Sequence, residues 1–190
     1  HLTGAGSVDV TGTEVSGNTA SAEGGGLWNS ASGTFTVTGS DIVGNTAGGN
    51  DADQGGGGLY NDGGTLTVRD STVDDNSATG TAGSGGGLLN KGVLEVTGTT
   101  FDANTSVRAG GAIETTDATT VALRDVVMTG NDTGASPGNG GGLHITAAGV
   151  VTYDGGRVTG NNADNEGGGL WNSSTGILTV TDVVISGNTA

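Results

Sequence analysis

Residues 86–104 read GGLLNKGVLEVTGTTFDAN, and this stretch holds the pattern from which the fold can be predicted. A glycine pair leads into Leu88, apolar Leu94 and Val96 alternate with polar residues, and Asn104 ends the stretch. Alternation with a period of two is typical of a β-strand that buries one of its faces. Each part of this pattern recurs along the chain.

The asparagine is the most regular part of the pattern, and it recurs at intervals of 27 to 31 residues. The seven positions are Asn18, Asn45, Asn76, Asn104, Asn131, Asn161 and Asn188. A bulky apolar residue stands three positions before each of them: Val15, Ile42, Val73, Phe101, Met128, Val158 and Ile185. A repeat near 28 residues is typical of a solenoid, in which each coil buries its apolar face against its neighbours.

Two strands can be assigned to each repeat. Apolar pairs ten and eight residues before each asparagine predict a strand with its apolar face inward: Val8/Val10, Phe35/Val37, Leu66/Val68, Leu94/Val96, Val121/Leu123, Val151/Tyr153 and Leu178/Val180. A glycine pair followed by two further residues predicts a second short strand at residues 25–28, 57–60, 86–89, 110–113, 141–144 and 168–171. Insertions such as residues 48–54 and 134–139 fall just after the asparagine, which places them in loops at one edge of the solenoid.

We therefore predict that residues 1–190 form an all-β, right-handed parallel β-helix with about 28 residues per coil and six to seven coils. His1 lies 17 residues before Asn18, the same phase that His144 has before Asn161. Terminal repeats of a free-standing solenoid are expected to be atypical and polar, and neither end has this character. We expect an excerpt of a longer solenoid with uncapped ends, and the alternative is that the ends stack on other subunits.

The charge of the chain excludes several kinds of partner. Its formal net charge is −15, with 20 acidic residues against five basic ones. A basic stripe is absent, so we expect no nucleic-acid partner, and anionic membranes are disfavoured for the same reason. No apolar run reaches about 18 residues, so we expect no direct membrane insertion in this segment. The lack of cysteine rules out disulfides and thiolate zinc sites.

Two short motifs occur in literal form in one repeat, GGAI at residues 110–113 and FDAN at residues 101–104. They resemble the Gly-Gly-Ala-Ile and Phe-x-x-Asn repeats of the polymorphic outer-membrane proteins (Pmp) and of related right-handed parallel β-helices on bacterial surfaces. Degenerate forms extend the resemblance over the whole chain. The resemblance implies a passenger domain that is displayed on the cell surface and is associated with adhesion.

Two columns of residues are candidate sites. The seven asparagines are expected to form a structural ladder, since stacked amides can bond to each other and to the turn backbone. A second column follows the motif leucines, and alternation along the strand would place it outside: Trp28, Tyr60, Leu89, Ile113, His144 and Trp171. An exposed strip of this kind would be a ligand or partner surface. The alternative is that the strip packs under an insertion loop.

Two acidic insertions offer carboxylates that calcium could use, at Asp51 and Asp53 and at Asp164 and Glu166. Calcium is therefore a candidate cofactor, and solvated acidic loops are the alternative. We predict no catalytic residue. The one adjacent acidic pair is Asp74-Asp75, and His144 lacks an acid–base partner at a recognisable spacing.

These observations predict a secreted or cell-surface protein that is not an enzyme. Its expected role is a structural and adhesive rod that presents binding surface to a protein or glycan ligand. Three alternatives stay open: a filament subunit assembled end to end, a non-catalytic part of a polysaccharide-active β-helix enzyme, and an ice-binding solenoid. The last rests on outward threonines, whose array is interrupted by charged residues such as Arg69 and Glu95.

Overall fold

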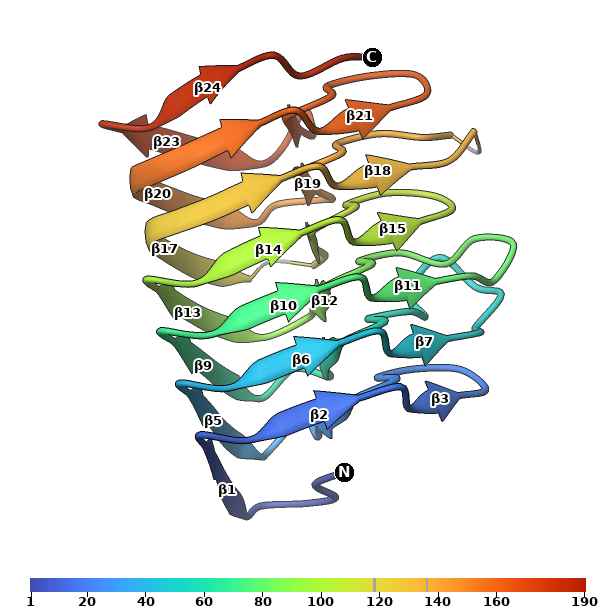
Figure 1. Cartoon of the computed structure of the whole chain (residues 1–190), viewed down its shortest axis with the longest axis vertical. Helices are drawn as coiled ribbons and strands as arrows, with labels where there is room; N and C mark the ends of the chain where they lie inside the picture. Colours follow the sequence, from blue (N-terminus) through green and yellow to red (C-terminus); the bar gives the residue numbers. More distant parts are fainter. Residues whose placement is uncertain (118, 136) are drawn as a thin grey trace.

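The computed structural model describes residues 1–117, 119–135 and 137–190, and it confirms the predicted parallel β-solenoid. Every helix or strand assigned in these ranges is a β-strand, and the strands of successive coils pair in parallel. About six turns, roughly 28 residues apart, stack along the long axis of the molecule (Figure 1).

One 12-stranded sheet folds around a corner and covers two faces of the solenoid. Its first face contains β1 (Ser7–Thr11), β5 (Thr34–Thr38), β9 (Thr65–Arg69), β13 (Val93–Thr97) and β23 (Ile177–Thr181). Its second face contains β2 (Glu14–Ser16), β6 (Asp41–Val43), β10 (Thr72–Asp74), β14 (Thr100–Asp102) and β24 (Val184–Ser186). Two ten-residue strands, β17 (Thr120–Thr129) and β20 (Val150–Thr159), run through the corner and join the faces.

Two six-stranded sheets complete each coil. The shorter strands are β3 (Thr19–Ala20), β7 (Thr46–Ala47), β11 (Ser77–Ala78), β15 (Thr105–Ser106), β18 (Asp132–Thr133) and β21 (Asn162–Ala163). The glycine motifs lead into β4 (Leu27–Asn29), β8 (Leu59–Asn61), β12 (Leu88–Asn90), β16 (Ile113–Thr115), β19 (Leu143–Ile145) and β22 (Leu170–Asn172). In Figure 1 the chain crosses the front from left to right through β2 and β3, returns behind through β5, and rises, which is a right-handed path.

The core is made of like residues stacked on like, because each strand pairs with its counterpart one coil away. Phe35 lies in register with Leu66, and Val37 with Val68. The predicted inward pairs of the central coils are at most 2% exposed. The residues three positions before the asparagines and the motif leucines belong to the same buried cluster. Removal of this continuous apolar column from water is the main driving force for folding.

The asparagine ladder is present. Each side-chain amide donates from Nδ2 to Oδ1 of the asparagine one coil further on, at 2.8 to 3.0 Å. The same Oδ1 also accepts the backbone N–H of the preceding ladder asparagine, for example that of Asn76 at Asn104. A second donation from Nδ2 reaches a carbonyl of the preceding coil, as from Asn104 to Val73. Each interior amide is therefore bonded to both neighbouring coils.

A second, shorter amide ladder lies at the end of the glycine-motif strands. Asn29 donates to Asn61 at 2.8 Å, and Asn61 donates to Asn90 at 2.7 Å. Asn90 then donates to the hydroxyl of Thr115 at 3.2 Å, after which apolar Ile145 takes the equivalent position. Its signal in the sequence was the asparagine that follows four of the six glycine motifs. The pattern thus changes at the coil that contains Thr115.

Candidate functional site

The predicted outer column has a different membership in the structure. The strand register places Trp28, Tyr60, Leu89, Glu114, His144 and Trp171 in one line. Ile113 lies in register with Leu88 and Leu143 and belongs to the apolar core, so its assignment to the column is wrong. The glycine motif of that coil carries Ala112 where the others have a third glycine, which displaced the assignment by one position.

The prediction that the column is exposed is also wrong for its central members. Tyr60 is 2% exposed, Leu89 and Glu114 are 0% exposed, and His144 is 3% exposed. Their side chains leave the core as the alternation requires, but the loops that follow the third strand of each coil cover them. The hydroxyl of Tyr60, for example, donates to the carbonyl of Asp53 in such a loop, at 3.0 Å.

The two tryptophans at the ends of the column are partly exposed and are held by loop carboxylates. Trp28 donates from Nε1 to Glu23 at 3.2 Å, and Trp171 donates to Glu166 at 2.9 Å. The ring of Trp171 stacks on the ring of His144 with a centroid separation of 4.3 Å. The aromatic groups therefore form stacked clusters under the loops in place of an open strip.

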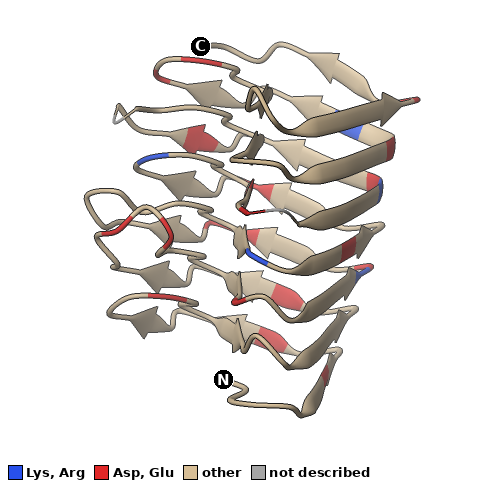
Figure 2. Cartoon of the chain, turned by 180° about the vertical axis from the view of Figure 1, so that it is seen from behind, with Lys and Arg blue, Asp and Glu red and all other residues tan. Residues whose placement is uncertain are grey.

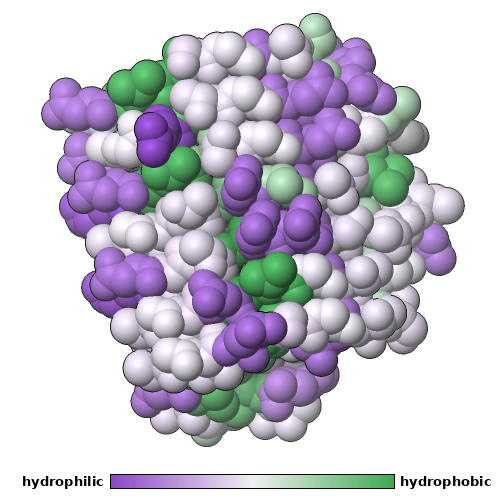
Figure 3. Space-filling model, viewed as in Figure 1, coloured by the Kyte–Doolittle hydropathy of each residue, from purple (hydrophilic) through white to green (hydrophobic). Residues whose placement is uncertain are grey.

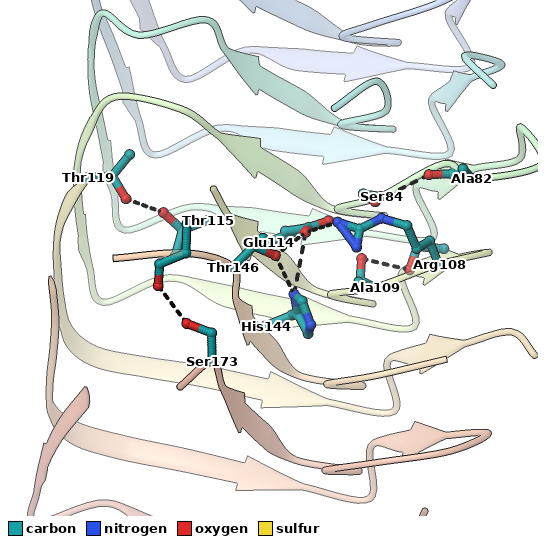
Figure 4. A network of polar contacts seen from close by, with 12 residues as sticks. Ala82, Ser84, Arg108, Ala109, Glu114, Thr115, Thr119, His144, Thr146 and Ser173 are labelled. Atoms are coloured by element: carbon teal, nitrogen blue, oxygen red, sulfur yellow. Dashed lines mark hydrogen bonds and ion pairs between the residues drawn. The ribbon is translucent and has the colours of Figure 1, made fainter. Parts of the chain in front are cut away.

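Glu114 is the centre of a polar cluster inside this column (Figure 4). Its Oε1 accepts hydrogen bonds from Arg108 at 2.6 Å and from the hydroxyl of Thr146 at 2.8 Å. Nδ1 of His144 lies 3.3 Å from the same oxygen and 3.1 Å from the Thr146 hydroxyl. Three coils contribute these side chains, since β16 carries Glu114, the preceding loop carries Arg108, and β19 carries His144.

This cluster breaks the repeat electrostatically. The other coils place apolar or aromatic residues in the column, whereas Glu114 puts a fully buried carboxylate there. A buried carboxylate is tolerated only where a cation and further donors compensate its lost hydration. Arg108, whose side chain is 16% exposed, supplies that charge. The cost of burying this pair makes it the most specialised position of the described solenoid.

A pocket of about 250 Å³ lies beside the cluster, at the edge where β12, β16 and β19 end. Its polar lining consists of Asp53, Lys91, Arg108, Thr116, Asp117 and Thr146. Lys91 lies 3.5 Å from Asp53 and 3.7 Å from Asp62, so the cation is balanced by two carboxylates at the rim. Burial, together with the carboxylates of Glu23 and Asp62, raises the pKa of Tyr60 well above its ordinary value.

Several buried polar atoms at this place have no hydrogen-bond partner among the described residues. They are Nε of Arg108, Oε2 of Glu114 and the hydroxyl of Thr116. Over the described part of the chain, two further side-chain atoms share this condition, in Asn29 and Thr133. Unpartnered buried polar atoms are uncommon in folded proteins, and each one calls for an explanation.

The carboxylates suggested for calcium do not come together. Asp51 and Asp53 lie in the loop before β8, and Asp53 pairs with Lys91. Asp164 and Glu166 lie in the loop before β22, where Glu166 accepts the bond from Trp171. In residues 1–117, 119–135 and 137–190, no group of three or more histidine, cysteine or acidic side chains is placed to hold a metal ion.

No protein-family model matches this chain, and neither a curated protein nor a solved structure matches it. Within the described residues, no helix has the length and hydropathy of a bilayer-spanning segment. The interpretation of the site therefore rests on the residues and distances given above.

Proposed function

We propose that this chain forms a structural and adhesive rod that is secreted or displayed on a cell surface, where it presents binding surface to a protein or glycan. The observation that carries the proposal is the asparagine ladder, which bonds each coil to both of its neighbours over seven positions. A solenoid coupled in this way is stiff along its length, and stiffness suits a rod that holds binding surface away from its base.

The surface chemistry supports the same proposal. Acidic side chains occur at many levels of the solenoid, whereas basic side chains are few and isolated (Figure 2). A strongly acidic surface favours solubility and prevents close association with anionic polymers. On the face shown in Figure 3, hydrophobic residues form separate small areas. The resemblance of residues 101–104 and 110–113 to repeats of bacterial surface proteins points in the same direction.

An incubation experiment separates adhesion from catalysis. The purified chain would be passed over immobilised neutral and acidic polysaccharides and over intact cells, and both retention and soluble saccharide products would be measured. Retention without products is the expected result. Release of shortened saccharides would contradict the proposal in favour of a polysaccharide-active enzyme. Absence of retention on every surface would contradict the adhesive part of it.

A further inference from the structure

We propose that the pocket between Arg108, Thr116 and Thr146 binds one neutral sugar residue of a glycan. This inference deepens the proposed adhesive function, on which it rests, by naming a subsite and the chemistry of its ligand. The pocket is the one place in the described structure where three unpartnered buried polar atoms gather beside a hollow.

The unpartnered atoms define what a ligand must offer. Thr116 lines the pocket, is 8% exposed, and its hydroxyl has no partner among the described residues. Nε of Arg108 is a donor that needs an acceptor, whereas a threonine hydroxyl can both donate and accept. A group that accepts from Arg108 and also bonds to Thr116 is a hydroxyl. Neighbouring hydroxyls on a sugar ring supply several such groups in a fixed arrangement.

The charges around the pocket favour a neutral ligand. Its lining holds two cations, Lys91 and Arg108, and two carboxylates, Asp53 and Asp117, so the lining itself is balanced. The buried carboxylate of Glu114 lies directly behind Arg108. A uronic acid or a phosphate would meet this extra negative charge, and a metal ion would meet the two cations. A polyhydroxylated neutral molecule meets neither penalty.

The size of the pocket fits a single ring. Its volume of about 250 Å³ is below the roughly 300–1,000 Å³ that is usual for drug-sized ligands. A hexose has twelve non-hydrogen atoms, and the efficiency of ordinary ligands then gives a dissociation constant on the order of 1 mM. Weak single sites of this kind are effective on a rod that meets a repetitive glycan, because linked contacts raise the overall affinity.

Glu114 acts in this proposal as a positioning residue. Its Oε1 holds Arg108 at 2.6 Å and Thr146 at 2.8 Å, and both of these residues line the pocket. The carboxylate itself is 0% exposed and does not contact the ligand. Its function is to fix the orientation of the guanidinium and of the hydroxyl that face the sugar.

The test is a titration of the isotope-labelled chain with D-galactose, D-glucose and D-mannose, with D-galacturonic acid as the acidic counterpart. We expect amide resonances of Thr116 and Thr146 to shift with at least one neutral sugar. Thr116→Val should weaken that binding about tenfold, since it removes one buried hydrogen bond to the ligand. Thr133→Val is the matched control, because the Thr133 hydroxyl is equally buried and unpartnered but lies on β18, outside the pocket.

Both variants remove an unpartnered hydroxyl, so neither should lower the melting temperature. Absence of shifts at the pocket with every neutral sugar would overturn the inference, as would equal binding by wild type and Thr116→Val. Tighter binding of galacturonic acid than of galactose would overturn the assignment to a neutral ligand. If the wild type adheres to glycans or cells and Thr116→Val adheres equally well, the subsite is refuted while the adhesive function stands. If the wild type does not adhere at all, the adhesive function fails on its own assay.

Discussion

Replacing Asn104 by alanine removes the middle of the asparagine ladder. The Asn104 Oδ1 accepts from the backbone N–H of Asn76 at 3.1 Å and from its Nδ2 at 3.0 Å. The Asn104 Nδ2 donates to Oδ1 of Asn131 at 2.9 Å and to the carbonyl of Val73 at 2.8 Å. The substitution therefore deletes four hydrogen bonds among groups that water does not reach.

The expected loss follows from counting these bonds. A hydrogen bond contributes about 1 kcal/mol net, and a buried group left without a partner costs about 1–3 kcal/mol. Two of the four groups keep another bond, since Asn76 still donates to Ile42 and Asn131 still accepts from the Asn104 backbone. We expect a loss of about 4 kcal/mol in the free energy of unfolding, a large share of the roughly 5–15 kcal/mol of a typical domain.

Asn18→Ala is the matched control at the same ladder position. Asn18 is exposed, and its side chain makes one bond, from Nδ2 to Oδ1 of Asn45 at 2.9 Å. Its loss should cost less than about 1 kcal/mol. Urea denaturation followed by circular dichroism measures both variants. A midpoint of Asn104→Ala equal to that of the wild type, or equal losses for the two variants, would refute the ladder as the main polar tie between coils.

Three further substitutions test other features. Ala103 has a φ of 49°, where four other ladder positions in the central coils and ends carry glycine or aspartate before the asparagine, so Ala103→Gly should raise stability by about 1 kcal/mol in thermal unfolding, and a fall would contradict left-handed strain at this turn. Glu114→Gln leaves the guanidinium of Arg108 without its counter-charge and should lower stability by about 3 kcal/mol in urea, whereas an unchanged midpoint would show that the pair is not needed for folding. Burial, followed by the charges of Asp75 and Asp102, raises the pKa of Asp74, so ionised Asp74 destabilises the fold; Asp74→Asn should raise the melting temperature at pH 7, and this gain should vanish below the ordinary aspartate pKa near 3.8, whereas a gain that persists at low pH would exclude the charge as its cause.

The fold could be predicted from the sequence because a solenoid repeats its instructions. The spacing of the asparagines and of apolar pairs such as Leu94/Val96 is a direct image of the stacking, since each strand pairs with its own counterpart. Local alternation and global register agree at every coil, and agreement between levels is what makes a sequence interpretable. The direction of the core and the role of the ladder follow from the same pattern.

The displaced assignment at Ile113 has a specific cause. The first glycine of each motif has a positive φ and fixes the frame, as at Gly85 (62°) and Gly110 (63°), whereas the sequence was aligned on the last two glycines before the leucine. A count to the next asparagine would have found the frame. That count is 18 residues from Leu27 to Asn45, and it selects Ile113 in the coil of Asn131.

The cover over the column could not be predicted in the same way. Whether Tyr60 and His144 face water depends on where the irregular loops fold, and loops carry no periodic signal. The pocket beside Arg108 is likewise assembled from residues of several coils that share no motif. One sign was available in the correct frame, because Glu114 would have been the single carboxylate in an otherwise uncharged column at neutral histidine.

The parallel pairing of every coil with the next has a mechanical consequence. All hydrogen bonds between coils point along the axis of the rod, so tension applied through the two chain ends peels coils away one after another. A released coil of about 28 residues extends to about 95 Å, many times the spacing it held in the stack. A tether built in this way lengthens in discrete steps at a nearly constant force and dissipates a sudden pull before its attachment breaks.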